Sequence, residues 1–462
     1  MATLATASAV AVQRRRRQVP ASTPLTASCG SIWHRWDPHV HLPGTLRNDN
    51  FGDMTVSEAL NILASRTPAI EAVGVTDYAT TASYYRALEA QRKGAGQDIE
   101  LFPNVELRLS HATNRDVAIN LHLLAPPSQV DELDRFLGGL ESVFADRTYR
   151  CDTQGLRDLG RAYGGDSSLP EAAALSQGAN QFKLDFEHLR TQFERSAWAK
   201  AHLLVAVAAG SGDGTSGLRT PDHAFNALRQ SIERFAHFMF TGNPQQVAFW
   251  LGQGADNEAT LLERYRGKKA CLHGSDAHDA ERLGLPAEER YCWIKGTPSF
   301  DTLRLACLSP ETRVYVGSVD PMDGYRHGRI SRIDVPDVDW FPADGVAINP
   351  GLVAIIGPRG SGKTALADLI AAGAGSTTPF ENPQSFVRRA GRLVEASTSK
   401  LEWTHGDTTE SRLTWDGSIS PTELGNVRYL SQQFVEQLCA GDGVSDNLLR
   451  EIERVVDRKS VV

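Results

Sequence analysis

An alternation of short apolar stretches and amphipathic stretches runs from about residue 32 to about residue 310 of this chain. Apolar runs bounded by turn residues predict buried strands, and apolar residues that recur every three to four positions predict helices. Strands and helices that alternate in this way are typical of a parallel α/β layout, either a barrel or an open sheet. The predicted strands are 72–77, 101–107, 117–124 and 237–240, the predicted helices are 58–64, 81–93 and 221–235, and 156–194 is predicted to be an inserted helical segment.

The amino-acid composition changes between Ser309 and Pro350, where prolines recur with glycine and aspartate between them. A chain of 462 residues exceeds what one core usually holds, so we expect more than one domain, with the boundary in this stretch. The predicted parts are a disordered N-terminal arm over 1–30, an α/β domain over 31–310, a linker over 311–334 and a second domain over 335–462, with 329–335 as a candidate first strand of that domain. The arm carries arginines at 14–17, and we favour a disordered arm, or a start site assigned too early, over a nucleic-acid-binding tail.

The composition excludes several classes of protein. The net charge of −8 gives no overall sign of nucleic-acid affinity, although a local basic patch stays open. The six cysteines contain no C-x-x-C pair, which argues against a zinc ribbon and fits a reducing cytoplasm. No apolar run reaches the roughly 18 residues of a membrane span, so we expect a cytoplasmic protein with no membrane partner.

Two pairs of metal-binding residue types lie far apart in the sequence, His39 with His41 and Asp276 with His278. Each pair has the spacing i, i+2, which on a β-strand puts both side chains on the same face. Imidazole and carboxylate groups bind divalent transition ions such as Zn, Mn or Fe. Two such pairs in one pocket would supply four ligands, so metal-assisted hydrolysis is the first hypothesis.

Asp77, Glu106 and His122 also lie at or near the ends of predicted strands. Together with the two pairs, they stand in an order that resembles the PHP (polymerase and histidinol phosphatase) metallophosphoesterases over residues 33–310. The resemblance implies a distorted (β/α)7 barrel with its metal site at the C-terminal ends of the strands, and a phosphodiester or phosphomonoester substrate. It implies that Glu106 bridges two ions and that Asp77 is either a ligand or a partner that orients a histidine. The implied metal ligands are His39, His41, Asp77, Glu106, His122, Asp276 and His278.

The chain departs from the PHP pattern at two positions. Where the family has Asp followed by His, this chain has Asp77 followed by Tyr78, and Asn243 stands where the family has the histidine of a Ser-His-Pro motif. A protonated phenol and a neutral amide are poor ligands for zinc, so a three-ion site would lose ligands while one or two ions could still bind. Two hypotheses therefore stay open: a metal-dependent phosphoesterase or nuclease, and a scaffold that has lost catalysis and acts as a binding module.

The segment Gly357–Thr364 matches the nucleotide-binding pattern G-x-x-x-x-G-K-[ST]. A β-branched run over 352–356 predicts the strand before it, and 365–372 predicts the helix after it. The pattern predicts that backbone N–H groups hold the phosphates of ATP, that Lys363 reaches the β- and γ-phosphates, and that Thr364 binds Mg²⁺. The predicted nucleotide-binding residues are Gly357, Gly360, Ser361, Gly362, Lys363 and Thr364.

The sequence after this loop predicts a hairpin over 401–415 and a strand over 426–431 that ends in Gln432 and Gln433. This order resembles the ABC and SMC-type ATPases, in which a glutamine contacts Mg²⁺ and the attacking water; we assign Gln432 to that place and leave Gln433 as the alternative. An apolar strand that ends in Asp-Glu is missing, as is an ABC signature. We therefore expect an incomplete ATPase α/β lobe, truncated at its C-terminus, that does not hydrolyse ATP alone.

A PHP domain followed by an SMC-like ATPase resembles the TrlF-like family, whose members occur among bacterial defence genes. The resemblance implies ATP, Mg²⁺ and a divalent transition metal as cofactors and a phosphate-ester substrate such as nucleic acid. It also implies a homodimer formed through the ATPase heads of the intact protein.

Overall fold

The computed structural model describes residues 30–113, 116–218, 223–322, 328–336, 338–376, 378–404, 406–413, 427, 429 and 430. These residues fall into two compact units, one over Gly30–Gly328 and one that begins at Arg329. The predicted arm lies outside the described residues except for Gly30. The segment 311–334, predicted as a linker, contains the strand Val314–Gly317 of the first unit and the strand Ile330–Asp334 of the second.

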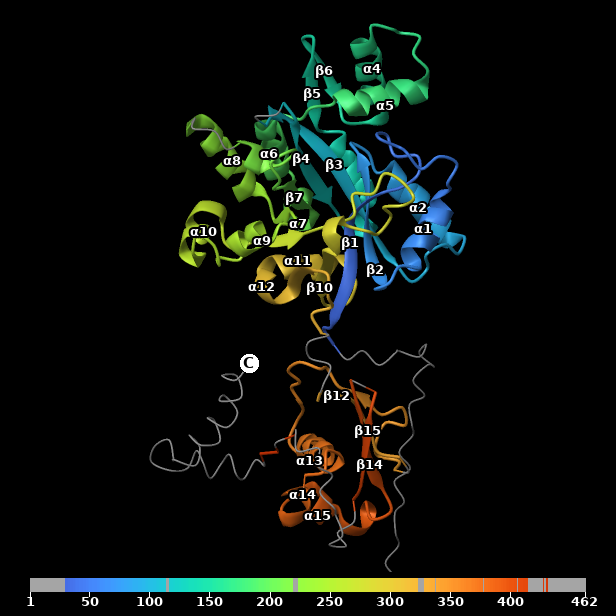
Figure 1. Cartoon of the computed structure of the whole chain (residues 1–462), viewed down its shortest axis with the longest axis vertical. Coiled ribbons are helices and arrows are strands. Elements are labelled where there is room, and N and C mark those ends of the chain that lie inside the picture. Colours follow the sequence, from blue (N-terminus) through green and yellow to red (C-terminus); the bar gives the residue numbers. More distant parts are fainter. Residues whose placement is uncertain are drawn as a thin grey trace, which may run out of the picture. The chain divides into compact units, whose positions relative to one another are not determined.

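A nine-stranded sheet forms the centre of the first unit, in the order β11-β10-β1-β2-β3-β4-β7-β8-β9 (Figure 1). The strands β1, β2 and β3 are parallel to one another, as are β7, β8 and β9. The strands of the sheet are β1 (Trp33–His41), β2 (Ile70–Tyr78), β3 (Glu100–Ala112), β4 (Ala118–Leu124), β7 (Leu204–Ala208), β8 (Phe238–Phe240), β9 (Ala270–Leu272), β10 (Tyr291–Lys295) and β11 (Val314–Gly317).

The prediction of a parallel sheet is right only in part. Strand β4 is antiparallel to both β3 and β7, and β10 is antiparallel to β1 and β11. The connection between β3 and β4 is residues 113–117, which is too short for the crossover that parallel neighbours need. The fold is therefore a mixed α/β sheet of nine strands, in which β4 and β10 depart from a purely parallel layout.

The sheet is nearly closed into a barrel. Its two edge strands, β9 and β11, contact one another. The chain after β9 runs beside the C-terminal part of β1. There the Asp276 amide donates to the His39 carbonyl over 2.9 Å, and Val40 pairs with Ala277. The closure of the sheet therefore brings the pair Asp276 and His278 next to the pair His39 and His41.

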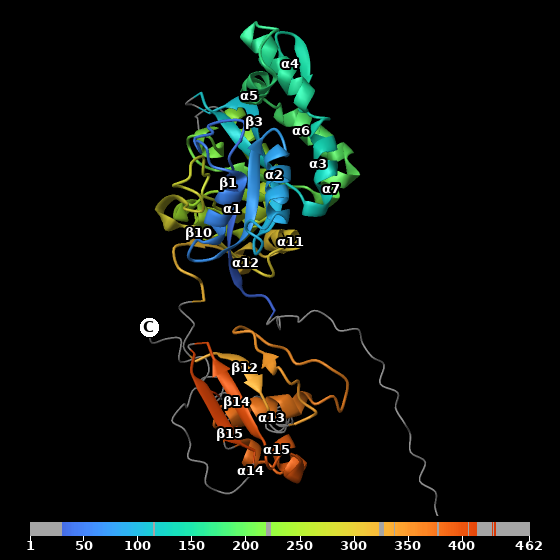
Figure 2. The same ribbon diagram turned by 90° about the vertical axis from the view of Figure 1, so that its right-hand side faces the viewer.

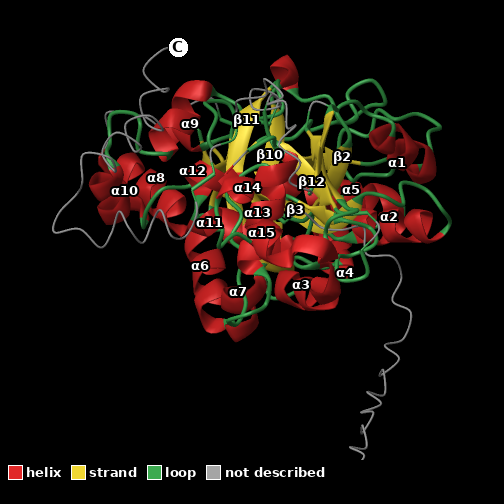
Figure 3. Cartoon of the chain, turned by 90° about the horizontal axis from the view of Figure 1, so that it is seen from below, coloured by secondary structure: helices red, strands yellow, loops and turns green. Residues whose placement is uncertain are grey.

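Helices surround the strands of the first unit (Figure 3). Helix α1 begins with a capping box in which Thr55 and Glu58 satisfy one another's backbone amides. The apolar side chains Leu60 and Leu63 of α1 pack against Val73 and Val75 of β2. The helices are α1 (Val56–Ala64), α2 (Ala82–Arg92), α3 (Val130–Leu137), α4 (Thr153–Gly164), α5 (Glu171–Gln181), α6 (Phe186–Arg195), α7 (Ala197–His202), α8 (His223–Phe235), α9 (Pro244–Trp250), α10 (Glu258–Tyr265), α11 (Phe300–Leu308) and α12 (Pro310–Arg313). Among all described helices, none has the length and apolar character that a membrane crossing requires.

The predicted inserted segment is confirmed as helices α4, α5 and α6, which lie between β4 and β7 in the chain. A short hairpin, β5 (Glu141–Phe144) with β6 (Arg147–Arg150), precedes them. Helices α4 and α5 approach closely because a side chain is absent at Gly178: a Cβ there would lie 1.7 Å from the Leu156 carbonyl oxygen. Helices α4 and α5 therefore form one closely packed pair.

The second unit has an antiparallel sheet in the order β13-β12-β14-β15, with helix α13 packed on it (Figure 2). Leu369 of α13 lies in one apolar cluster with Ile333 and Leu401 of the sheet. The predicted helix 365–372, the strand 329–335 and the hairpin after 401 are all present. The elements are β12 (Ile330–Asp334), β13 (Val346–Ala347), α13 (Lys363–Gly373), α14 (Thr378–Glu381), α15 (Phe386–Ala390), β14 (Thr398–Trp403) and β15 (Thr408–Arg412).

The predicted strand over 352–356 is wrong. These residues form no strand, and their side chains are exposed, with Leu352 97% and Ile356 89% accessible. An apolar strand becomes stable only when neighbouring strands satisfy its backbone groups and cover its side chains, and no described residue pairs with this segment. Most of the predicted strand 426–431, with Gln432 and Gln433, lies outside the described residues.

Candidate functional site

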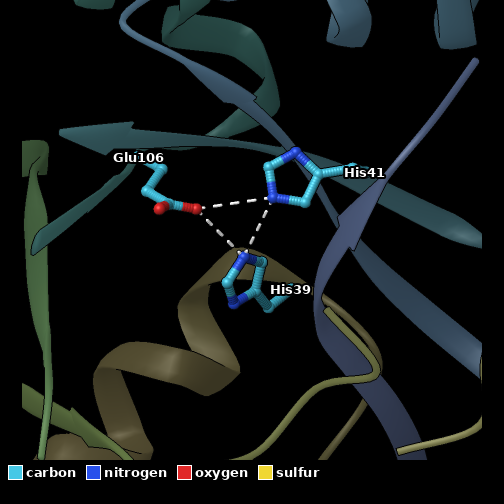
Figure 4. A group of neighbouring side chains, drawn as sticks. All are labelled: His39, His41 and Glu106. Atoms are coloured by element: carbon cyan, nitrogen blue, oxygen red, sulfur yellow. Dashed lines mark hydrogen bonds and ion pairs between the residues drawn. The ribbon is translucent and has the colours of Figure 1, made fainter. Parts of the chain in front are cut away.

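The side chains of His39, His41 and Glu106 point toward one another inside the nearly closed sheet (Figure 4). His39 and His41 alternate onto one face of β1, and Glu106 comes from β3. The distances are 3.2 Å between the two Nε2 atoms, 3.3 Å from His39 Nε2 to Glu106 Oε2, and 3.4 Å from His41 Nε2 to Glu106 Oε2. All three side chains are largely buried.

These three distances fit a single metal ion. Ligands that surround zinc tetrahedrally at about 2.0–2.1 Å lie about 3.3–3.4 Å apart. The Glu106 Oε2 atom is buried and has no hydrogen-bond partner, although two imidazole nitrogens are within ion-pair distance of it. In the metal-free protein the two imidazoles are the groups that compensate this buried carboxylate oxygen, and a metal ion held between the three side chains would take over that role.

Asp276 brings a second carboxylate to the same two histidines. Its Oδ1 atom lies 3.2 Å from His39 Nε2 and 3.6 Å from His41 Nε2, and its side chain is 58% exposed. Asp276 has a left-handed backbone with φ of 48°. Gly274 permits the preceding turn, since a Cβ there would lie 2.7 Å from the His39 amide nitrogen. The cluster is thus open to solvent on the Asp276 side.

The imidazole of His41 is held by a chain of hydrogen bonds on its far side. Thr45 Oγ1 donates to Asp77 Oδ1 over 3.1 Å, so the same hydroxyl accepts from His41 Nδ1 at 3.2 Å. The proton of neutral His41 is therefore on Nδ1, and the lone pair of Nε2 faces Glu106.

Asp77 itself points away from the cluster. In the parallel register Tyr78 pairs with Glu106, so Tyr78 lies on the cluster face of the sheet and Asp77 on the opposite face. The Asp77 carboxylate accepts from Thr45, the amide of Leu46, the amide of Tyr78 and the Ser83 hydroxyl. Of the two roles that the sequence left open for Asp77, these contacts match the partner that orients a histidine.

His122 is oriented by a buried residue that the sequence did not single out. Asn104 donates through Nδ2 to the Pro38 carbonyl and the Thr76 hydroxyl, each over 3.0 Å, so its Oδ1 accepts from His122 Nδ1 at 3.1 Å. The His122 ring lies 4.5 Å from the His39 ring. The structure thus places His122 beside the cluster with Nδ1 occupied.

Tyr78 contacts the second predicted pair directly. Its hydroxyl lies 2.9 Å from His278 Nε2, and His278 Nδ1 lies 3.0 Å from the Asp276 carbonyl. The rings of Tyr78 and His278 both stack with the ring of His41. A second group of ligand atoms, from His41, Asp276 and His278, comes within 4.8 Å, but both nitrogens of His278 already have hydrogen-bond partners.

Asn243 and the loop after β7 complete the comparison with prediction. The Asn243 side chain accepts from the amides of Gln245 and Gln246 and so caps α9.

Asp213 lies in the glycine-rich loop after β7, and its carboxylate accepts a hydrogen bond from the Asn120 side-chain amide over 3.1 Å. Burial, together with the charges of Glu106 and Asp276, raises the pKa of the Asp213 carboxyl. Asp213 was not among the site residues predicted from the sequence.

The charges in the cluster are strongly coupled. Burial, the largest influence, lowers the pKa of His39, but the charges of Asp276 and Glu106 outweigh it and raise the pKa from 6.5 to about 9. Burial raises the pKa of Glu106, yet its contacts with His39 and His41 hold it well below 4.5. Burial and the charge of His39 keep the pKa of His122 well below 6.5. Without a metal ion, Glu106 is therefore an anion and His39 a cation at neutral pH.

The glycine-rich loop of the second unit has a defined conformation. Gly360 and Gly362 have φ of 81° and 91°, which favours glycine, and α13 begins directly afterwards at Lys363. The Lys363 amine donates to the Gly357 and Pro358 carbonyls over 2.8 and 2.9 Å. A cavity of about 750 Å³ borders the loop and is lined also by Asp368, Arg389 and Tyr429.

Neither a protein-family model nor a curated protein matches the chain. Solved structures that are similar include a candidate metal-dependent phosphoesterase from Bifidobacterium adolescentis, with 15% identity, 59% of this chain and 96% of that chain covered, and a TM-score of 0.30. PsfC from Pseudomonas syringae has 13% identity, 61% of this chain and 98% of that chain covered, and a TM-score of 0.28. Such low TM-scores support no conclusion about function, so the assignment rests on the geometry of the site.

Proposed function

We propose that the unit over Gly30–Gly328 is a metal-dependent phosphoesterase. The observation that carries the proposal is the set of three mutual distances, 3.2 to 3.4 Å, among His39 Nε2, His41 Nε2 and Glu106 Oε2. Asp276 is the candidate fourth ligand, and a Zn, Mn or Fe ion suits this donor set.

The donor set and its surroundings fit hydrolysis of a phosphate ester. A bound ion of this kind acts as a Lewis acid toward a phosphoryl oxygen and lowers the pKa of bound water toward ~7. Thr45 and Asp77 hold His41 in the tautomer that ligation needs, and Asn104 does the same for His122. The exposed side at Asp276 gives a substrate access to the cluster.

The alternative proposal, a binding module without turnover, is favoured by one contact. Tyr78 occupies Nε2 of His278, where a multi-ion site would need a free nitrogen. Under the phosphoesterase proposal this contact implies that the His39–His41–Glu106 group holds one ion and that His278 orients Asp276. Under the alternative, no described group turns over a phosphate ester.

Elemental analysis and activity measurements on the full chain separate the two. We expect about one equivalent of a transition ion, and metal-dependent hydrolysis of p-nitrophenyl phosphate or bis-p-nitrophenyl phosphate. Both are lost in His39→Ala and retained in the control His202→Ala, whose side chain stacks on Trp198 away from the cluster. A protein that binds metal and hydrolyses neither ester with added Mn²⁺ supports the binding module, and a protein that binds no metal refutes the site itself.

We propose as a second function that the loop over Gly357–Thr364 binds ATP with Mg²⁺. The conformation of Gly360 and Gly362, the start of α13 and the adjoining cavity support the proposal. Binding of a fluorescent ATP analogue to the full chain, lost in Lys363→Ala and kept in Lys400→Ala, is the expected result. Coupling between the two units, a nucleic-acid substrate and a homodimer through the ATPase unit stay predictions.

A further inference from the structure

Arg47, Arg108 and Lys183 lie at one side of the metal cluster without a carboxylate partner. Within the part of the chain that the structure describes, no ion pair within 4.0 Å includes any of them. All three are partly buried, so solvent screens their charges less than those of fully exposed side chains. Such an arrangement costs stability and is typical of a site for an anion.

The backbone holds Arg108 and Lys183 next to one another. Leu184 forms a parallel bridge with Leu109, in which the Leu184 amide donates to the Arg108 carbonyl and the Ser110 amide donates to the Leu184 carbonyl, each over 2.8 Å. Because Arg108 precedes Leu109 and Lys183 precedes Leu184, these two hydrogen bonds keep the two cationic residues on adjacent segments.

Helix α5 of the inserted segment holds all three cations in place. The Arg108 guanidinium donates to the backbone carbonyl and to Oδ1 of Asn180, near the end of α5. Ser176 of α5 donates to the Leu46 carbonyl over 2.7 Å and so positions the residue that follows it, Arg47. Lys183 lies two residues beyond the last residue of the helix, Gln181. The insertion therefore places these charges, and the barrel alone would not.

Arg108 and Arg47 lie on the side of the cluster. Arg108 is two residues beyond Glu106 on β3 and so projects from the same face, roughly 6–7 Å further along the strand. The Arg47 guanidinium lies 4.7 Å above the ring of Tyr78, the residue that contacts His278. An anion held here would thus be a neighbour of the metal-bound phosphate and not that phosphate itself.

The charges influence one another. Burial and the charges of Arg108 and Arg47 lower the pKa of Lys183 to about 8. Mutual repulsion of this kind is relieved when an anion binds between the groups.

We propose that Arg47, Arg108 and Lys183 form a subsite for a second phosphate group of the substrate, next to the phosphate ester at the metal cluster. The inference rests on the proposed phosphoesterase function and makes it more specific, because it selects substrates with two phosphates in close succession. Guanidinium groups bind phosphate oxygens in pairs, which provides such selection. The second phosphate belongs either to a small bisphosphorylated molecule or to the next linkage of a short oligonucleotide.

Binding of anions to the metal-free full chain tests the subsite independently of catalysis. Calorimetry compares a sugar bisphosphate with its monophosphate, and a 5′-phosphorylated dinucleotide with the mononucleotide. We expect the native chain to prefer the ligand with two phosphates in at least one pair by roughly tenfold, the size of one charge-assisted interaction. The pair that shows the preference identifies the source of the second phosphate.

The variants Arg47→Gln and Lys183→Gln should each remove most of this preference. The control Arg190→Gln removes the same charge from an exposed arginine that is paired with Glu187 on α6, and should keep the preference. Circular dichroism confirms that each variant folds. Equal affinity for one and two phosphates in the native chain, or an equal loss in the control, overturns the subsite. Absence of hydrolysis with the preference intact would instead overturn the phosphoesterase.

Discussion

The side-chain cluster of His39, His41 and Glu106 in the first unit and the glycine-rich loop in the second were both predicted from short motifs. The surroundings of these two regions differ. At the cluster, residues from β1, β3 and the chain after β9 meet, and buried partners orient them. At the loop, the glycine conformations and α13 are present, but the predicted strand before it is exposed. The difference shows that a short motif gives a well-ordered site only where the surrounding strands and helices are packed around it.

We expect the largest effect where the backbone of Gly274 lies against the backbone of His39. Gly274→Ala would place a Cβ 2.7 Å from the His39 amide nitrogen and push Asp276 from the histidines. We expect loss of bound metal and a decrease of roughly 1–3 kcal/mol in the free energy of unfolding. The control is Gly212→Ala, where an added Cβ meets nothing within 4 Å. Equal metal content in both variants, measured by elemental analysis, would contradict the placement of Asp276.

Removal of the hydroxyl that orients His41 should have the next largest effect. Thr45→Val keeps the shape of the side chain but deletes the acceptor for His41 Nδ1 and the donor to Asp77. We expect metal affinity to fall about 10–100-fold, since loss of such outer partners has this effect at other metal sites. Calorimetric titration with Zn²⁺ measures it, with Thr260→Val on α10 as the control. Unchanged affinity would show that Asp77 and Thr45 do not orient a ligand.

Acidity should control metal binding at the cluster. The pKa of His39 rises from 6.5 in the unfolded chain to about 9, so its ion pairs stabilise the metal-free protein fully below pH 6.5 and are lost as the pH rises through 9. A metal ion must displace the His39 proton, so metal affinity should increase up to about tenfold per pH unit in this window. Titrations in buffers of different ionisation enthalpy measure the released proton. Affinity that does not change between pH 6.5 and 8 would mean that His39 is no ligand.

The smallest effect is expected at the exposed segment before the loop. Ile356→Ser should change the free energy of unfolding by no more than about 0.5 kcal/mol, because the side chain is 89% exposed. Val75→Ala, at a position that is 1% exposed, should cost about 2 kcal/mol. Chemical denaturation of each variant provides the comparison. A large cost at Ile356 would show that this segment is covered in solution.

Much of the cluster could be predicted because the i, i+2 pairs and the polar residues near strand ends are visible in the sequence. Asn104 and Thr45 could not be found in this way, since an asparagine in a strand and a threonine in a loop have no pattern that marks them. The resemblance left Asp77 open as a ligand or as a partner that orients a histidine, and the sequence could not decide between them because the choice depends on the pleat of β2, which turns Tyr78 and not Asp77 toward Glu106. The three cations were missed because they come from a loop, a strand and an insertion that are distant in the chain.

The sequence by itself determined local features: several strands and helices of the first unit, the insertion, the ligand types in the two pairs, and the glycines that shape the loop at Gly357–Thr364. These follow from interactions between residues close in the chain, such as side-chain alternation, capping and backbone freedom. Only the tertiary structure decided that β4 and β10 are antiparallel, that the Tyr78 hydroxyl contacts Nε2 of His278, and that the Arg47 guanidinium lies above the ring of Tyr78. Each of these depends on the register between strands and on closure of the sheet, which arise from contacts between residues far apart in sequence.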